Sequence, residues 1–225
     1  MKRILWAAAV AVIALAGVAG TASAQAFSPG EIYLKGFGGA TWPSNFDTTL
    51  EEDGERIALP DFDYDTGYTL GAAVGAAFTP NISMEIEYAY RSADVTITDR
   101  AGDDDSVTAN GDTSADAVML NALYVFDGLG ATGAVRPYLG AGIGAAKVDV
   151  DAGGQNFDSG TRFAYQVIGG IGYEVNPAVS LYAEGRWFGT GPGRYDGPAT
   201  ENFDGEFETF DLLVGLRYVF GPTMR

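Results

Sequence analysis

The sequence predicts an all-β fold, an eight-stranded antiparallel up-and-down transmembrane β-barrel. Three observations lead to this prediction. Apolar and polar residues alternate with a period of two in eight segments. The connectors between these segments alternate between short and long. No apolar stretch after Ala24 is long enough for a transmembrane helix, and strands in lipid must pair every backbone group, which only a closed sheet allows.

Four segments show the alternation most clearly: residues 67–78, 81–91, 161–175 and 178–188. Residues 81–91, for example, place Ile86 and Tyr88 on one face and Glu85 and Glu87 on the other. Four further segments follow the same pattern: residues 31–41, 114–126, 137–148 and 208–220. An even number of strands closes an antiparallel meander with both termini at one end.

The connectors sort by length around this meander. Those at 79–81 and 176–177 are tight and 127–136 is moderate, whereas those at 42–66, 92–113, 149–160 and 189–207 are long. Short turns at one end and long loops at the other are typical of bacterial outer-membrane barrels. The four long connectors hold 21 of the 30 acidic residues. We therefore predict long acidic loops on the extracellular side and both termini on the periplasmic side.

The first residues predict export. Lys2 and Arg3 precede an uncharged apolar run at 4–19, and Ala22 and Ala24 provide the small residues that a signal peptidase accepts. We expect cleavage between Ala24 and Gln25, which gives a signal peptide at 1–24 and a barrel domain at 25–225. Removing the signal peptide leaves 11 basic and 30 acidic residues, a net charge of −19. Nucleic acid is not expected as a partner of so acidic a chain.

The chain contains neither histidine nor cysteine. It therefore lacks the usual general base, a thiol nucleophile and the commonest metal ligands. The run Asp103–Asp105 suggests calcium, but Val107 and Thr108 occupy positions where an EF-hand loop needs a ligand and a glycine. We predict no catalytic residues, no cofactor and no metal site.

A period of two does not by itself distinguish a barrel in lipid from a soluble β-protein. The export signal favours the membrane, and so do aromatic residues near the strand ends, because such residues form interfacial girdles. The faces opposite the apolar ones are rich in Gly, Ala and Ser, which suits a narrow interior.

Isolated charges also lie on these opposite faces. Because unpaired buried charges are costly, we predict that they form a structural network in the lumen: Lys35, Glu85, Glu87, Arg91, Glu184, Arg186 and Arg217. A catalytic carboxylate pair is the alternative interpretation of Glu85 and Glu87, or of Glu184. An eight-stranded barrel is narrow enough for side chains to fill. The strand glycines would then either leave gaps for water or make room for Tyr138 and Tyr182.

Two segments carry a resemblance to a known family. Residues 136–144 (RPYLGAGIG) and 163–173 (FAYQVIGGIGY) resemble strands five and six of small eight-stranded outer-membrane β-barrels. That family includes OmpA transmembrane domains, OmpX-like proteins and opacity-type surface antigens, and the resemblance covers residues 25–225. The last strand is similar to the C-terminal strand that the barrel-assembly machinery recognises, which implies that partner through Phe220. The family normally ends at this aromatic residue, whereas five residues follow it here.

Together these features predict a surface-exposed outer-membrane protein of a Gram-negative bacterium, surrounded by outer-membrane lipid and without catalytic activity. Two alternatives stay open. One is a narrow porin-like channel for small solutes, and the other is an adhesin whose loops bind a host or cell-surface ligand. Some relatives of this architecture are enzymes, but as families they use histidine, which this chain lacks.

Overall fold

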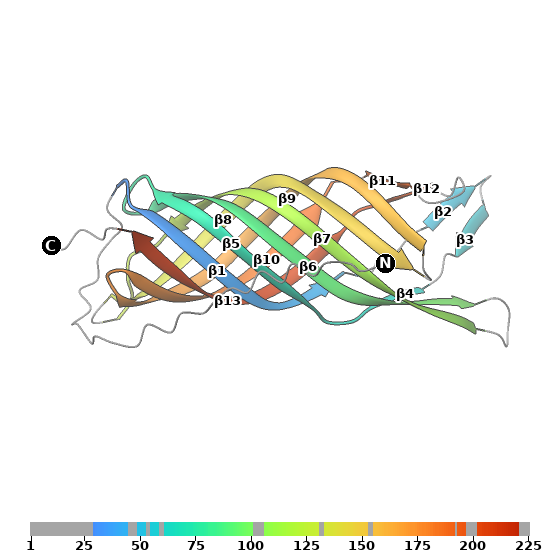
Figure 1. Ribbon diagram of the computed structural model, residues 1–225, viewed down its shortest axis with the longest axis horizontal. Helices are drawn as coiled ribbons and strands as arrows, with labels where there is room; N and C mark the ends of the chain where they lie inside the picture. Colours follow the sequence, from blue (N-terminus) through green and yellow to red (C-terminus); the bar gives the residue numbers. More distant parts are fainter. Residues whose placement is uncertain are drawn as a thin grey trace, which may run out of the picture.

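The computed structural model describes residues 29–44, 49–52, 55–58, 61–100, 106–130, 133–152, 155–191, 193–196 and 202–220. Eight strands form a closed antiparallel barrel (Figure 1): β1 (Ile32–Pro43), β5 (Gly67–Ala77), β6 (Ile82–Arg100), β7 (Ser106–Val125), β8 (Val135–Ala152), β9 (Gln155–Asn176), β10 (Val179–Thr190) and β13 (Glu208–Phe220). The predicted all-β fold and its eight strands are confirmed. No helix among the described residues is long and apolar enough to cross a membrane.

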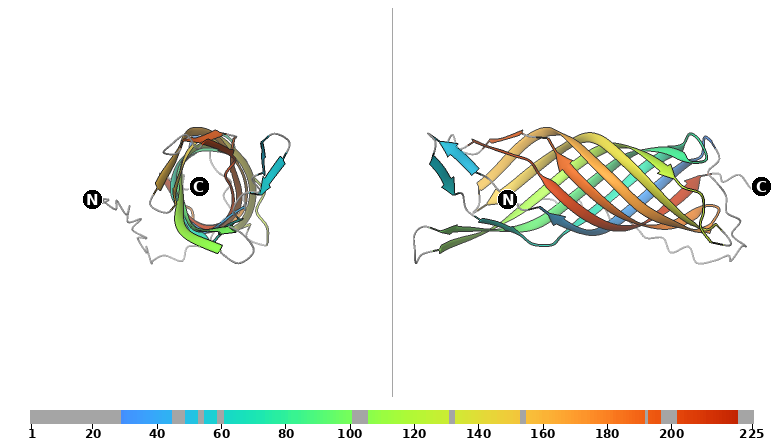
Figure 2. Two further views of the ribbon diagram at one scale, coloured as in Figure 1. Left: turned by 90° about the vertical axis from the view of Figure 1, so that its right-hand side faces the viewer. Right: turned by 180° about the vertical axis from the view of Figure 1, so that it is seen from behind.

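Each barrel strand pairs with its neighbours along the chain, and β1 pairs with β13 to close the sheet. The closing register runs from Ile32 opposite Phe220 to Pro43 opposite Thr209. The beginning of β1 and the end of β13 therefore lie at the same end of the barrel. Seen along its axis, the barrel is a closed ring (Figure 2).

The connectors divide between the two ends. The connectors after β5, β7 and β9 lie at the end of the barrel where β13 ends. We call this end the turn end. The opposite loop end carries five short strands (Figure 1): β2 (Thr49–Glu52), β3 (Glu55–Ala58), β4 (Asp61–Tyr64), β11 (Gly193–Asp196) and β12 (Asn202–Gly205). Here β4 pairs with β6, and β11 pairs with β9, so both extend the barrel wall.

Two connectors predicted as long, 92–113 and 149–160, are mostly strand. The β6–β7 hairpin stays paired as far as Arg100 opposite Ser106, and the β8–β9 hairpin as far as Ala152 opposite Gln155. Antiparallel pairing continues into water because it needs only backbone groups. Beyond the lipid, however, no apolar face is required, so the alternation that reveals a strand in the sequence fades.

Outward-facing side chains form an apolar band with an aromatic belt at each end. The turn-end belt contains Phe78, Tyr124, Phe126, Tyr173, Tyr218 and Phe220. The loop-end belt contains Trp42, Tyr68, Tyr88, Phe163, Trp187 and Phe210. Between Phe210 and Phe220 a strand tilted by about 40° rises about 25 Å, the height of an outer-membrane apolar band. These belts therefore match the two interfaces of a bilayer.

Apolar layers occupy the lumen on both sides of its middle. The layer toward the loop end includes Met119, Val148, Phe188 and Phe207, and the layer toward the turn end includes Tyr33, Leu123, Val125, Tyr138 and Ile168. Strand glycines make room for the rings: a Cβ on Gly75 would lie 2.3 Å from Tyr33, and one on Gly170 would lie 2.4 Å from Tyr138. At these positions the glycines accommodate tyrosines.

Gly170→Ala is expected to lower the free energy of unfolding by about 1–3 kcal/mol, the usual cost of overpacking. The Tyr138 ring has little freedom to move, because its hydroxyl donates a hydrogen bond to Glu184 at 2.8 Å. Gly169→Ala is the control on the same strand. Its Cβ would point outward and meet no atom closer than 3.6 Å, so little change is expected. Urea unfolding in lipid vesicles compares the two, and equal losses would contradict the prediction.

Candidate functional site in the barrel lumen

In this barrel the buried side chains are those that face the lumen. The outward residues Ile86 and Val214 are 64% and 65% exposed, whereas Glu85 and Glu87 beside Ile86 are each 1% exposed. Successive strand residues point to opposite faces, so the alternation read from the sequence places the charges inside. Six of the seven predicted network residues are buried: Lys35, Glu85, Glu87, Arg91, Glu184 and Arg186.

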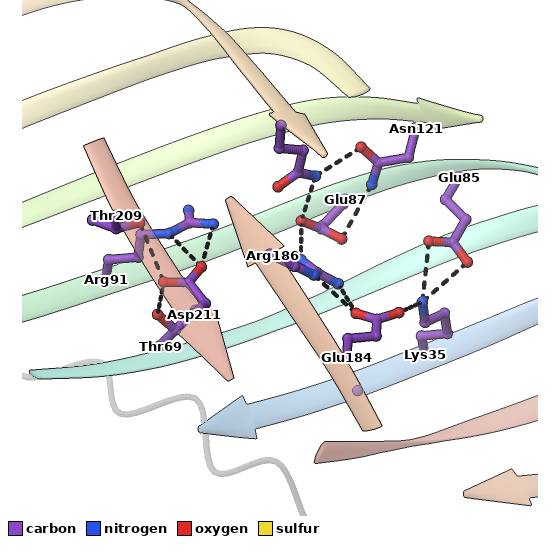
Figure 3. Close-up of polar contacts among 12 residues, drawn as sticks. Lys35, Thr69, Glu85, Glu87, Arg91, Asn121, Glu184, Arg186, Thr209 and Asp211 are labelled. Carbon is purple, nitrogen blue, oxygen red and sulfur yellow. Dashed lines mark hydrogen bonds and ion pairs between the residues drawn. The ribbon is translucent and has the colours of Figure 1, made fainter. Parts of the chain in front are cut away.

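Five of these residues meet in one group, which we call the first ionic cluster: Lys35 of β1, Glu85 and Glu87 of β6, and Glu184 and Arg186 of β10 (Figure 3). Lys35 Nζ lies 2.7 Å from Glu184 Oε1 and 3.3 Å from Glu85. Arg186 donates to Glu87 at 2.7 Å and to Glu184 Oε2 at 2.5 and 2.8 Å. The cluster joins strands that are not neighbours in the sheet, so it spans the lumen.

Neutral side chains supply further hydrogen bonds to the same carboxylates. The Tyr33 hydroxyl donates to Glu85 at 2.9 Å. The amides of Asn121 and Gln166 donate to Glu87 at 3.2 and 3.3 Å. Buried charges are tolerated when they are both paired and hydrogen-bonded, and the three carboxylates of the cluster meet this condition.

Arg91 lies in a second ionic cluster, closer to the loop end, and Figure 3 shows the two groups apart. Its Nε and Nη2 atoms each lie 2.9 Å from Asp211 Oδ2. The other oxygen of Asp211 accepts hydrogen bonds from three threonines, at 2.5 Å from Thr41, 3.4 Å from Thr69 and 3.2 Å from Thr209. We define the second ionic cluster as these five residues.

Arg217 occupies a third place, near the turn end. Its Nη2 atom donates to Ser180 Oγ at 3.1 Å, and its guanidinium lies 5.6 Å from the centre of the Tyr33 ring. The seven predicted residues therefore share the lumen but fall into three groups of contacts. A sequence shows that residues face inward, but the level of each depends on strand tilt and register.

Sequence reasoning left out charged residues that are buried in the lumen wall, among them Asp211, Arg136 and Arg162. Asp211, the partner of Arg91, lies on the inward face of the last strand, and the two-residue alternation of residues 208–220 alone would have included it. Arg136 was assigned to the connector at 127–136, but it lies in β8 and its Nε is 2.9 Å from Glu174. This assignment was wrong because the arginine precedes Pro137, and a proline favours an extended residue before it.

Aromatic rings flank four of the lumen cations. Lys35 lies 4.5 Å from the centre of the Tyr182 ring, and Arg186 lies 4.4 Å from that of Phe37. The guanidinium of Arg91 lies 3.9 Å from the centre of the Phe188 ring. Rings at these distances attract the cations and fill space that water would otherwise occupy. The arrangement is chemically suited to filling and rigidifying the interior.

Other predicted sites fall elsewhere. Ala24 and Gln25 lie outside the described residues, as does the tail that follows Phe220, so the signal peptide and its cleavage stay predictions. The recognition of Phe220 by the assembly machinery also stays a prediction. Among the described residues no group of three or more acidic side chains is arranged to hold a metal ion.

Comparison with known proteins supports the same fold. The sequence matches the outer membrane protein beta-barrel domain family over residues 9–220, whereas no match was found among curated protein sequences. Neisserial surface protein A is 20% identical, with 84% of this chain and 97% of that chain covered and a TM-score of 0.56. OprG from Pseudomonas aeruginosa is 16% identical, with 85% and 96% covered and a TM-score of 0.58. The closed eight-stranded barrel and the family match lead to one conclusion: the chain belongs to the outer membrane protein β-barrel domain family and is a protein of the outer membrane.

Proposed function

We propose that this protein is a non-catalytic structural barrel that presents an acidic surface outside the cell. The loop end would face the exterior, and the turn end, where β1 begins and β13 ends, would face the periplasm. The observation that carries the proposal is the filled lumen. Two ionic clusters and two apolar layers occupy the interior, and this filling favours a structural role over a solute channel.

Acidic side chains on the loop-end half of the wall support the surface role. Asp94 and Asp112 are exposed and lie directly opposite each other on β6 and β7, while Asp149 of β8 lies opposite Ser114. Like charges in directly opposed positions destabilise a sheet. Such pairs cost least in water, where charges are well screened, so this part of the wall suits the aqueous side of the membrane.

Cysteine labelling tests the orientation, because the chain has no cysteine of its own. Asp94→Cys is expected to react with a membrane-impermeant maleimide added to intact cells. Leu129→Cys is the matched control: Leu129 is 55% exposed but lies at the turn end, and it should react only after the outer membrane is opened. If only Leu129→Cys were labelled in intact cells, the turn end would face the exterior, and the proposed orientation would be wrong.

The absence of histidine and cysteine supports a non-catalytic role. The carboxylates of both ionic clusters are also engaged with cations and hydrogen-bond donors. A cluster of this kind stabilises one arrangement of the strands. The proposed role is therefore to hold a rigid barrel in the membrane while the loop end meets the surroundings of the cell.

A further inference from the structure

The hairpin formed by β6 and β7 extends beyond β8 and β9 at the loop end (Figure 1). Its two strands stay paired as far as Arg100 opposite Ser106. The next strand, β8, pairs with β7 only as far as Ala152 opposite Gly111. Among the described residues, no strand pairs with residues 106–110 on the side away from β6. We call this five-residue segment the free edge.

The backbone of the free edge directs hydrogen-bonding groups away from β6. Successive residues of an antiparallel strand direct their N–H and C=O groups to opposite sides. At the other end of the hairpin, Val125 N donates to Asn81 O, just before β6, at 2.8 Å. Phe126 N donates to Pro137 O of β8 at 2.9 Å. The β6–β7 register has no shift, so the even-numbered residues of the free edge point away from β6: Ser106, Thr108 and Asn110.

The fold covers comparable edges elsewhere at the loop end. The short strand β4 pairs with the outer part of β6, and β11 pairs with β9. An uncovered edge can bind another strand, so natural proteins protect such edges with charged residues or proline. The sequence of the free edge, SVTAN, contains neither. Its five residues extend over about 17 Å, the length of an ordinary strand, so the free edge is suited to accept an added strand.

The charge around the free edge indicates which kind of strand would bind. Residues 92–114 contain six aspartates and one arginine, a net charge of −5. Asp94 and Asp112 are exposed and lie opposite each other near the base of the free edge. A second copy of this chain would bring the same negative charge to the same place, and like charges repel. A basic segment would instead be attracted.

We propose that the free edge binds a basic, extended segment of another protein, which adds to the sheet as a strand beside β7. The backbone of the segment pairs with the outward N–H and C=O groups of Ser106, Thr108 and Asn110. Backbone pairing provides the affinity, and the acidic hairpin selects lysine and arginine in the segment. The inference rests on the proposed function, because the partner is an external protein only if the loop end faces outward.

A synthetic peptide of alternating lysine and threonine tests the proposal on the purified barrel in nanodiscs of zwitterionic lipid. Thr108→Pro is expected to weaken its binding about tenfold, because proline has no N–H to donate. The N–H that is lost points away from β6, so the hairpin keeps its own hydrogen bonds. Thr108→Ala is the matched control, because it keeps the N–H and should bind the peptide like the wild type. Equal affinity for wild type and Thr108→Pro would overturn the proposal.

Two further peptides separate strand addition from simple charge attraction. A peptide of alternating glutamate and threonine is expected not to bind. A lysine–threonine peptide with methylated backbone nitrogens keeps its charge but cannot complete the pairing, so it should also bind at least several-fold more weakly. Equal binding of the methylated peptide would mean that charge alone attracts it, and equal binding of the glutamate peptide would contradict the selection of basic segments.

Amide hydrogen exchange measured by NMR locates the contact. The lysine–threonine peptide is expected to slow exchange at Ser106, Thr108 and Asn110, because these N–H groups become hydrogen-bonded. Slow exchange at Val107 and Ala109 in Thr108→Pro verifies that the hairpin is intact. Unchanged exchange at all three outward positions would contradict the proposal, as would dimers of the wild type that Thr108→Pro abolishes. Nanodiscs expose both ends of the barrel, so these results are independent of the cysteine labelling that tests the orientation.

Discussion

Replacing Arg186 with methionine is expected to lower the free energy of unfolding of the barrel by about 3–5 kcal/mol. The side chain is fully buried and donates to Glu87 and Glu184. Methionine fills much of the same space but supplies no charge and no donor. Three buried carboxylates would then share Lys35 as the remaining cation of the first ionic cluster. The loss comes mainly from uncompensated buried charge.

Equilibrium unfolding in urea, with the protein folded into lipid vesicles, measures this loss. Lys147→Met is the matched control, because its ion pair with Asp149 at 3.2 Å involves a side chain that is 45% exposed. Exposed pairs contribute about 0–1 kcal/mol. Adding Glu87→Gln and Glu184→Gln to Arg186→Met should recover part of the loss. If Arg186→Met and Lys147→Met proved equally mild, the first ionic cluster would not contribute to stability as argued.

The barrel itself was predictable because lipid imposes a pattern on the sequence. Every outward residue within the apolar band must tolerate hydrocarbon, so Ile82, Met84 and Ile86 alternate with Ser83, Glu85 and Glu87. Each tight turn then marks a change of direction. Outside the lipid this constraint ends, and the outer halves of β6 and β7 were accordingly assigned to a loop.

The same two-residue alternation predicted that the lumen charges point inward, but it did not predict which residues form ion pairs with them. Arg91 and Glu87 are four residues apart on one face of β6, yet they belong to different ionic clusters. Glu87 binds Arg186 of β10, and Arg91 binds Asp211 of β13. These contacts cross the lumen, so they depend on strand tilt and on the register of closure, neither of which a single sequence specifies.

The two ionic clusters lie at different levels of the same narrow lumen, and this has a consequence for permeation. A solute that crosses the barrel must pass both, and also the apolar layer in which Phe188 packs against Phe207 with ring centres 6.4 Å apart. Barriers in series each limit the flow. Removing one of them therefore leaves the passage closed by the others.

Opening the lumen is accordingly expected to require two sets of substitutions. The first set, Glu87→Ser with Arg186→Ser, removes one charge of each sign from the first ionic cluster. The second set, Arg91→Ser with Asp211→Ser and Phe188→Ser, removes the ion pair of the second cluster and the ring that packs on Arg91. Both sets leave the net charge of the protein unchanged, so the expected change in conductance arises from the space that the smaller side chains free.

Single-channel recording in planar bilayers measures the result, and a heat-dependent shift in gel mobility verifies that each variant has folded. The wild type and the two single sets are expected to give no conductance steps, and the combined variant to give regular ones. Conductance from the first set alone would mean that the second ionic cluster and Phe188 do not close the lumen. Conductance from the wild type would favour the channel alternative over a structural barrel, because an eight-stranded barrel conducts only where its side chains leave a continuous path.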